Sequence, residues 1–449
     1  MKKIFQYIML AVVTIVMASC TSDIEEPTAT TGKSNVQLIV GEFPAFGDSQ
    51  TRAIGTPDEG KTSWAEGDEL LLEIDNTSYG RHNATFTYNG KSWELTSGEL
   101  VYLEGDPAYI SHVYYAPNYK WSNSSLMLKK GKVAGTDELI EGKARITGNG
   151  ETITVSFAEA TRKYSRLRIA TLPNEQITVD TEYFTPAGSS DMEQNGNYTL
   201  TSDEKGNAYL YGTFENNSEV TVKYREAALT TYTFSQATES AKSYALDATV
   251  ISANSAEEIK SAIEQKVADG KTTIRLNLAP NAGTDEFMAI REAIKGAAPN
   301  DEGTIELTII GVETIPKEAF YKMLQLKSVR MSDVKEIKKY AFKECQYLTV
   351  VEAPSLNKLN SGAFNKCNLL SKLTFGPINY ADERNWPIFE YITPNIDLIL
   401  SDYQKEMIET DSYLYTANND RDYAGSDEHN SKNFLGREFR SITCRYKVK

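Results

Sequence analysis

The sequence predicts a multidomain protein in which an all-β N-terminal half precedes a C-terminal α/β solenoid. The first half consists of short alternating apolar and polar runs broken by Gly, Asn, Asp and Pro, which is typical of β-sandwiches. The second half shows a 22-residue period in its apolar residues, which indicates stacked repeats. We expect a leader at 1–19, an acidic tether at 20–35, β-sandwiches at 36–160 and 161–251, a helix-strand N-terminal cap at 252–311, repeats at 312–379 and a C-terminal cap at 380–449.

Residues 1–19 have the layout of a secretory signal peptide. Lys2 and Lys3 precede an apolar run that extends from Ile8 to Met17, and Ala18 and Ser19 supply the small residues before the cleavage point. A helix needs roughly twenty apolar residues to span a bilayer, and this run has about half of them. A retained transmembrane anchor is therefore the less favoured alternative.

The four residues Met17–Cys20 resemble the bacterial lipobox, although the family prefers Leu where this chain has Met17. The resemblance implies cleavage before Cys20 and acylation, including palmitate, that anchors the protein to a lipid bilayer. At about 0.8 kcal/mol per buried methylene, several acyl chains make release negligible. Thr21 replaces the Asp of inner-membrane lipoproteins, and residues 22–26 resemble an acidic surface-export signal. Together they imply the outer membrane and the cell surface; an ordinary signal peptide is the alternative.

Charge and cysteine usage exclude several classes of protein. Loss of Lys2 and Lys3 with the leader changes the formal net charge from −15 to −17. Nucleic acid and anionic lipid surfaces are poor partners for such a chain, because binding them requires clustered cations. Cys345, Cys367 and Cys444 are too few for a disulfide scaffold and too widely spaced for a zinc site. We expect no metal and no cofactor.

The repeats begin at Val312, and an Ala-Phe pair recurs at 319–320, 341–342 and 363–364. Their pattern, I-x3-A-F-x2-C-x2-L-x2-[VL], resembles the BspA-type leucine-rich repeat of bacterial surface proteins over residues 312–375. This resemblance implies an interaction surface and no catalytic residues.

Alternation along the repeat strands divides their residues between two faces. We expect Val329, Met331, Val351, Ala353, Leu373 and Phe375 to point inward. The candidate ligand-binding residues are then those that point outward, namely Ser328, Arg330, Val350, Glu352, Lys372 and Thr374. A merely solvated face is the alternative for each of them.

Cys345 and Cys367 occupy one repeat position in adjacent coils. Stacked coils lie about 4.8 Å apart, which is within disulfide reach. Because Met323 fills the same position in the first repeat, we favour a ladder of buried thiols over a disulfide.

Two helix-strand units precede the repeats. Ser255 and Glu258 form a capping-box start, and Gly270 and Gly296 stand where the helices are expected to end. The expected strands of the caps are Ile274–Leu278 and Ile305–Ile309 before the repeats, and Asn395–Leu400 and Phe439–Tyr446 after them.

In the N-terminal half, Ala84–Tyr88 and Lys91–Leu95 flank Asn89-Gly90, which predicts a hairpin with a type I′ turn. Further expected strands are Val36–Val40, Leu70–Ile74, Thr152–Phe157, Leu167–Ala170, Ala208–Thr213 and Val220–Tyr224.

Four segments of this half, Thr51–Ala53, Trp64–Asp68, Tyr114–Pro117 and Lys242–Leu246, together resemble the fimbrillin-like (Mfa-like) family of lipoproteins. The resemblance implies two stacked transthyretin-like β-sandwiches. In pilus-forming relatives a protease cuts after an N-terminal Arg, and Arg52 is the candidate here; an unprocessed loop Arg is the alternative.

Enzyme motifs are not supported by their context, so we expect no enzymatic activity. Gly55–Thr62 matches a P-loop expression, but no apolar strand precedes it and a strand-like segment follows it. His82, His112 and His429 lie in no hydrolase signature. Carboxylate pairs such as Asp68 with Glu69 or Asp301 with Glu302 are expected by chance among 62 acids.

Three functions fit these features. The first is a cell-surface adhesin whose repeats bind a protein or glycan on host matrix or on another cell. The second is the anchor or tip subunit of a fimbria, with other fimbrial subunits as partners. The third is a glycan-binding protein, motivated by 4 Trp and 26 Tyr that could stack on sugars.

Overall fold

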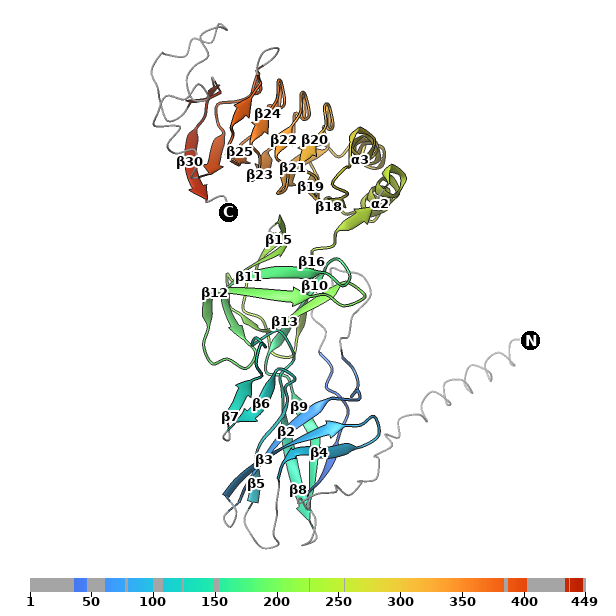
Figure 1. The fold of residues 1–449 in the computed structure, drawn as a ribbon, viewed down its shortest axis with the longest axis vertical. Coiled ribbons are helices and arrows are strands. Elements are labelled where there is room, and N and C mark those ends of the chain that lie inside the picture. Colours follow the sequence, from blue (N-terminus) through green and yellow to red (C-terminus); the bar gives the residue numbers. More distant parts are fainter. Residues whose placement is uncertain are drawn as a thin grey trace, which may run out of the picture.

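The computed structural model describes residues 36–46, 61–76, 80–99, 108–122, 125–148, 153–225, 227–253, 255–382, 387–401, 433–435 and 437–446. Three units follow one another along its long axis: a first β unit, a second β unit and a solenoid (Figure 1). Within the described part of the chain, no helix has the length and apolar character needed to cross a bilayer.

The first β unit is a seven-stranded sheet with the order β1-β9-β8-β5-β2-β3-β4. Its strands are β1 (Val36–Val40), β2 (Glu69–Asn76), β3 (Gly80–Tyr88), β4 (Trp93–Gly98), β5 (Ala108–Tyr115), β8 (Ile140–Gly148) and β9 (Ile153–Thr161). The predicted strands at 36–40, 70–74 and 152–157 are confirmed to within one residue of their starts. A separate hairpin is formed by β6 (Tyr119–Ser122) and β7 (Ser125–Leu128). Leu70, Leu72, Phe86 and Val113 lie in the core of this unit.

The predicted hairpin is formed by β3 and β4, with Tyr88 opposite Trp93. Its turn differs from the predicted type I′, which needs positive φ at both central residues. The Asn89 N–H donates to the Ser92 carbonyl at 3.0 Å, so the central residues are Gly90 and Lys91. Of these two, only Gly90 has a positive φ. Asn89 instead accepts the N–H groups of Lys91 and Ser92 with its side chain, which explains the shift of the turn by one residue.

The second β unit also has seven strands, in the order β15-β14-β11-β13-β10-β16 with β12 paired to β11. They are β10 (Ser165–Ala170), β11 (Gln176–Pro186), β12 (Glu193–Thr201), β13 (Asn207–Phe214), β14 (Glu219–Tyr224), β15 (Ala227–Thr233) and β16 (Ser243–Asp247). The strands predicted at 167–170, 208–213 and 220–224 are confirmed. Their core contains Ile169, Val179, Leu210 and Phe214.

The solenoid is built on two parallel sheets, a long one and a short one. The long sheet comprises β17 (Ile251–Ala253), β18 (Thr273–Leu278), β19 (Ile305–Ile310), β21 (Leu326–Met331), β23 (Val350–Ala353), β25 (Lys372–Phe375), β27 (Asp397–Ser401) and β30 (Ser441–Tyr446). The short sheet comprises β20 (Thr314–Ile315), β22 (Glu336–Ile337), β24 (Lys358–Leu359) and β26 (Tyr380–Ala381). A small hairpin of β28 (Asn433–Phe434) and β29 (Arg437–Glu438) lies before β30.

The 22-residue period is the register of the long sheet, since Val329 lies opposite Val351 and Val351 opposite Leu373. The recurrent Phe of each repeat stacks on the next one. Ring centroids are 5.1 Å apart for Phe320 and Phe342 and 5.4 Å apart for Phe342 and Phe364. Offset aromatic stacks add about 0.5–1.5 kcal/mol per pair to the burial of the rings.

The coils continue beyond the predicted repeat boundary at residue 379. Phe389 stacks on Phe364 at 5.7 Å, and β26 and β27 extend the two sheets. Part of the stretch that we expected to be a C-terminal cap is therefore one more coil. Its sequence hides the period because Phe389 follows Phe364 by 25 residues instead of 22.

Helices α2 (Ala256–Ala268) and α3 (Thr284–Ala297) cover the N-terminal end of the solenoid (Figure 1). The predicted start at Ser255 is confirmed, because its side chain accepts the N–H of Glu258. Gly270 follows α2 with a φ of +74°, as expected for a helix stop. The expectation for Gly296 is wrong, since α3 runs through it to Ala297.

Candidate functional site

The outward face of the long sheet carries the candidate ligand-binding residues. One row runs in register through Glu306, Ser328, Val350, Lys372 and Asp397. A second row runs through Thr308, Arg330, Glu352, Thr374 and Ile399. Parallel pairing brings residues side by side that are 22 positions apart in the sequence from β19 to β25 and 25 positions apart from β25 to β27.

The predicted inward residues are confirmed, since Val329, Met331, Val351, Ala353, Leu373 and Phe375 are all buried. Ser328 contradicts its predicted exposure, because only 5% of it is accessible. It lies opposite Glu306 on one side and Val350 on the other, and both of these neighbours have longer side chains. The usable outward residues are therefore Arg330, Val350, Glu352, Lys372 and Thr374, which are half-buried or exposed.

Opposite charges alternate across this face. Arg330 Nε donates to Glu352 Oε2 at 3.0 Å, and Lys372 Nζ lies 3.7 Å from Glu352 Oε1. Such exposed pairs contribute only about 0–1 kcal/mol each to stability. Their charges consequently remain available to a ligand at little cost to the fold.

The second β unit covers the N-terminal end of the same face. Arg275 of β18 donates from Nε to the Leu229 carbonyl of β15 at 2.6 Å. Ile310, at the end of β19, is fully buried within the apolar core of the second β unit. Thr308 is also buried. Glu306 of β19 keeps partial exposure, and the rest of the outward face that remains open to solvent lies on the strands from β21 onward.

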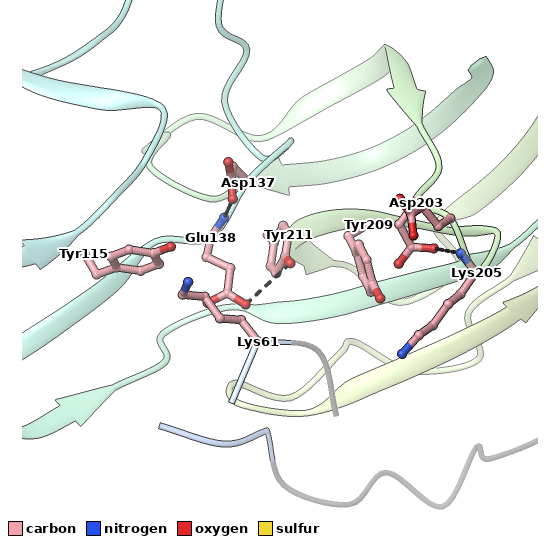
Figure 2. Close-up of a pocket in the computed structure, with 9 residues that line it drawn as sticks. Lys61, Tyr115, Asp137, Glu138, Asp203, Lys205, Tyr209 and Tyr211 are labelled. Atoms are coloured by element: carbon pink, nitrogen blue, oxygen red, sulfur yellow. Dashed lines mark hydrogen bonds between the residues drawn. The ribbon is translucent and has the colours of Figure 1, made fainter. Parts of the chain in front are cut away.

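A cleft of about 480 Å³ lies between the two β units (Figure 2). Tyr115 lines it from the first unit, and Tyr209 and Tyr211 line it from β13 of the second. Asp137 and Glu138 project from the segment before β8. Burial raises the pKa of both carboxyl groups, although Arg162 opposes this effect at Glu138.

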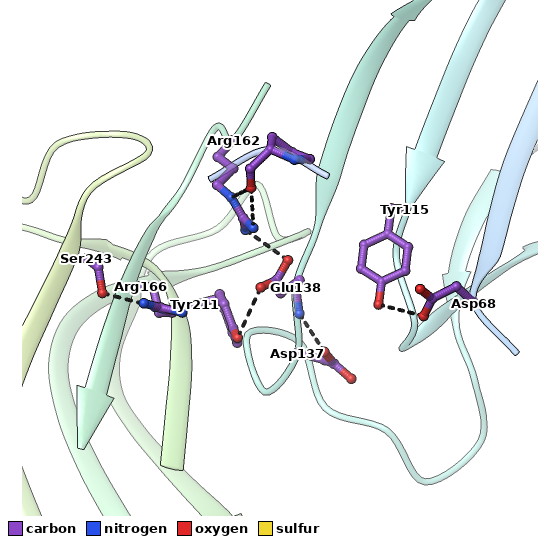
Figure 3. Close-up of polar contacts among 9 residues, drawn as sticks. Asp68, Tyr115, Asp137, Glu138, Arg162, Arg166, Tyr211 and Ser243 are labelled. Atoms are coloured by element: carbon purple, nitrogen blue, oxygen red, sulfur yellow. Dashed lines mark hydrogen bonds and ion pairs between the residues drawn. The ribbon is translucent and has the colours of Figure 1, made fainter. Parts of the chain in front are cut away.

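The cleft is held together by a network of polar contacts (Figure 3). Arg162, in the linker between the units, donates to Glu138 Oε2 at 2.9 Å and to the Pro44 carbonyl at 2.9–3.0 Å. Tyr211 donates to Glu138 Oε1 at 3.5 Å. The ring of Phe46 lies 3.7 Å from the Arg162 guanidinium and 4.4 Å from that of Arg166. These contacts join the units, so we assign the cleft to their junction.

No signal in the sequence marks this cleft, because its residues come from four separated segments. Asp68 and Glu69, considered above as a carboxylate pair, are instead neutralised separately. Asp68 pairs with Lys61 at 2.8 Å and accepts the Tyr115 hydroxyl, whereas Glu69 pairs with Lys129 at 2.6 Å.

The thiol ladder is confirmed, since Cys345 and Cys367 are both free and fully buried. Each thiol donates to a carbonyl of the preceding coil, Cys345 to Phe320 at 2.9 Å and Cys367 to Phe342 at 3.0 Å. Burial raises the pKa of Cys345 to about 12, so the thiol is unreactive. Cys444 is half-buried.

Cys20, Arg52 and His429 lie outside the described residues, as does most of the P-loop-like segment. The segment after it is a strand, β2, and not the helix that a P-loop requires. His112 Nδ1 lies 3.1 Å from the Tyr114 hydroxyl. Within the described residues, no group of His, Cys, Asp and Glu has the geometry of a metal site.

Comparison with known proteins bears on the solenoid. A family model of the BspA type leucine rich repeat region matches residues 310–408 in six copies. Among solved structures, the chain is similar to a proposed cell adhesion protein from Bacteroides fragilis NCTC 9343, with 11% identity and a TM-score of 0.30, over 49% of this chain and 93% of that one. No curated protein sequence matches the chain. Residues 310–408 therefore form a region of BspA-type leucine-rich repeats.

Proposed function

We propose that this protein is a surface lipoprotein of the adhesin type, in which the repeats bind a ligand on host matrix or on another cell. Acylated Cys20 anchors it in the outer membrane. The two β units form a stalk, for which the transthyretin-like sandwiches of fimbrillin-like lipoproteins are the proposed architecture. The function is binding and not catalysis.

The outward face of the repeat strands is the observation that supports this proposal most directly. It displays Arg330, Glu352 and Lys372 on coils of constant spacing, and those coils match a repeat of bacterial surface proteins. The first β unit, which follows the proposed anchor in the sequence, lies at the opposite end of the molecule from the repeats (Figure 1). An anchored chain of this shape holds its repeats away from the membrane.

The test reverses the pattern of charge on the face while keeping its ion pair. The double variant Arg330→Glu with Glu352→Arg retains a pair at the same two positions but exchanges their signs. Adhesion of cells that express it to a panel of matrix proteins and glycans should fall at least about tenfold, since like charges across an interface cost several kcal/mol.

The matched control is Lys358→Glu with Glu336→Lys, which exchanges a pair of similar exposure between neighbouring strands of the short sheet. This control should leave adhesion unchanged. If the Arg330 and Glu352 exchange also left adhesion unchanged, the outward face of the long sheet would not be the binding surface.

A second candidate function, the anchor or tip of a fimbria, is favoured by the packing of residues 36–46. β1 is an edge strand that pairs in parallel with β9, and Leu38 and Phe43 enter the core of the first unit. Cleavage after Arg52 would free this segment and expose a groove that fits a strand of another subunit.

Mass spectrometry of surface filaments sheared from cells separates the two functions. A fimbrial subunit appears in the filament fraction with a new N-terminus at Ala53. A stand-alone adhesin stays on the cells with an intact segment, and Arg52→Ala does not alter its surface level.

A further inference from the structure

The turns that lead from the short sheet to the long sheet carry lysines and tyrosines in a continuous line. The turns stack in register, because the Lys322 N–H donates to the Lys343 carbonyl at 3.0 Å and the Glu344 N–H to the Asn365 carbonyl at 2.8 Å. We call this line the lysine–tyrosine ridge; its members are Tyr321, Lys322, Lys339, Tyr340, Lys343 and Lys366.

The tyrosine rings hold the ammonium groups in place. Lys322 Nζ lies 5.2 Å and Lys343 Nζ 5.9 Å from the centre of the Tyr321 ring. Lys339 Nζ and Lys343 Nζ lie 4.7 Å and 4.8 Å from the centre of the Tyr340 ring. Cation–π contacts of this kind restrict the lysine side chains, so the ammonium groups are partly preorganised.

The ridge carries more positive charge than its carboxylates balance. Lys322, Lys343 and Lys366 share the carboxylate of Glu344, at 3.6, 4.0 and 3.8 Å. By contrast, Lys327, Lys335 and Lys358 on the same coils each pair with one glutamate of the preceding coil, for example Lys327 with Glu306 at 2.8 Å. A local surplus of cations on a chain of net charge −15 indicates an anionic partner.

Helix α3 adds to this positive field. Arg291 lies at the first repeat turn, where its Nη1 donates to the Glu318 carbonyl at 3.1 Å. Burial lowers the pKa of Lys295, and the charges of Arg291 and Lys322 lower it further. The cations of α3 and of the repeat turns therefore act on one region of the surface.

We propose that the lysine–tyrosine ridge binds a linear acidic polysaccharide that carries sulfate or carboxylate groups. Lys322 and Lys366 stand at one repeat position two coils apart, roughly 10 Å, and Lys343 lies beside Glu344 on the coil between them. This spacing suits a chain that carries anions at regular intervals. Lysines act as point charges and accept such groups in many orientations. A single flexible chain can follow the ridge alone, whereas a DNA duplex or an anionic membrane presents a broad anionic surface to a chain of net charge −15.

This site is separate from the outward face of the long sheet, so the two proposals are tested apart. The ridge variant is Lys322→Gln with Lys343→Gln and Lys366→Gln. The matched control is Lys327→Gln with Lys335→Gln and Lys358→Gln, which removes three lysines from other faces of the same coils, each paired with one glutamate. Both are made in the full secreted chain carrying Cys20→Ala, and unchanged thermal midpoints establish that they fold.

The probe is a heparin fragment of defined length, titrated at 50 and 200 mM salt, with neutral dextran and single-stranded DNA of equal charge as comparisons. We expect heparin affinity to fall with salt, to fall about tenfold or more in the ridge variant and to change less than about twofold in the control. Equal losses in both variants, no heparin binding at 50 mM salt, or tighter binding of DNA than of heparin would overturn the proposal. If cells that express the ridge variant still adhere, the proposed function of the outward face of the long sheet is unaffected.

Discussion

Two junctions hold the three units in line, and they are stabilised by different interactions. Between the β units, Arg162 and Glu138 form an ion pair with side chains that are only 4% and 5% exposed. Between the second β unit and the solenoid, Ile310 inserts into an apolar core. Arg275 donates to the Leu229 carbonyl and lies 3.9 Å from the partly exposed Asp247 carboxylate. The first junction thus depends on a desolvated charge pair and the second mainly on apolar burial.

The junctions should also respond to pH in opposite directions. Burial raises the pKa of Glu138, so the folded protein favours the protonated carboxyl group. The contribution of Glu138 to folding stability is therefore lost as the pH rises. At the second junction, burial alone would raise the pKa of Asp247, but hydrogen bonds from Thr249 and the charges of Lys266 and Arg275 lower it. The contribution of Asp247 is therefore present above its unfolded pKa and lost as the pH falls.

The largest effect should come from Arg162→Met, which leaves the Glu138 carboxylate buried without its partner. Breaking a buried pair in this way costs about 3–5 kcal/mol, which urea unfolding at pH 8 would measure. The control is Lys163→Met, an exposed neighbour that should cost less than about 0.5 kcal/mol. A loss below about 1 kcal/mol for Arg162→Met would show that the charge pair does not hold this junction.

The pH dependence of Arg162→Met sharpens the same test. Without Arg162, the pKa of Glu138 rises further above its unfolded value, so the variant should lose less stability at pH 5 than at pH 8. A variant of the second junction, Ile310→Ala, should lose the same amount at both pH values, because an apolar side chain does not titrate. Equal pH responses of the two variants would contradict the comparison.

At the second junction, Ile310→Ala should cost about 2–4 kcal/mol through the cavity that it leaves. The matched control is Ile309→Ala on the same strand, since Ile309 points to the opposite side and is buried in the solenoid core. Hydrogen exchange distinguishes them: Ile310→Ala should accelerate exchange in β14 and β15, and Ile309→Ala in the repeat strands. Acceleration of the repeats alone by both variants would count against insertion of Ile310 into the second unit.

The sequence predicts the solenoid in more detail than the junctions, because a repeat places equivalent residues in equivalent surroundings. Val329, Val351 and Leu373 share one apolar environment, and their spacing reveals both the strand and its inward face. The burial of Ser328 could not be predicted in this way. It depends on the size of the neighbouring side chains, which the 22-residue period does not specify.

Contacts between units have no periodic signal. Arg275 and Leu229 are 46 residues apart and Arg162 and Glu138 are 24 apart, and nothing in their local sequence marks either pair. Each arginine is also unremarkable in a chain with 24% charged residues. The sequence consequently does not reveal that the second β unit covers the outward face of β18 and β19, next to the candidate binding residues.

Arg275→Met tests the polar part of the second junction. It should cost about 1–3 kcal/mol, because the buried Leu229 carbonyl loses the guanidinium that donates to it at 2.6 Å. Urea unfolding measures this loss, and Lys271→Met, an exposed change next to the same strand, should have no measurable effect. A loss as large as that of Ile310→Ala would mean that hydrogen bonding, and not apolar burial, dominates here.

The smallest effect is expected for Thr249, which links the second junction to α2. Lys266 Nζ donates to Thr249 Oγ1 at 2.6 Å, and that hydroxyl donates to Asp247 Oδ1 at 2.6 Å. Thr249→Val should cost about 0.5–1.5 kcal/mol at pH 7, whereas Thr249→Ser keeps the hydroxyl and should cost less. Because the lost hydrogen bond lowers the pKa of Asp247, the difference between Thr249→Val and the natural protein should shrink as the pH falls through that pKa. If the difference in stability instead grew as the pH fell, the pH dependence assigned to Asp247 would have the wrong sign. The two junctions would then no longer respond to pH in opposite directions.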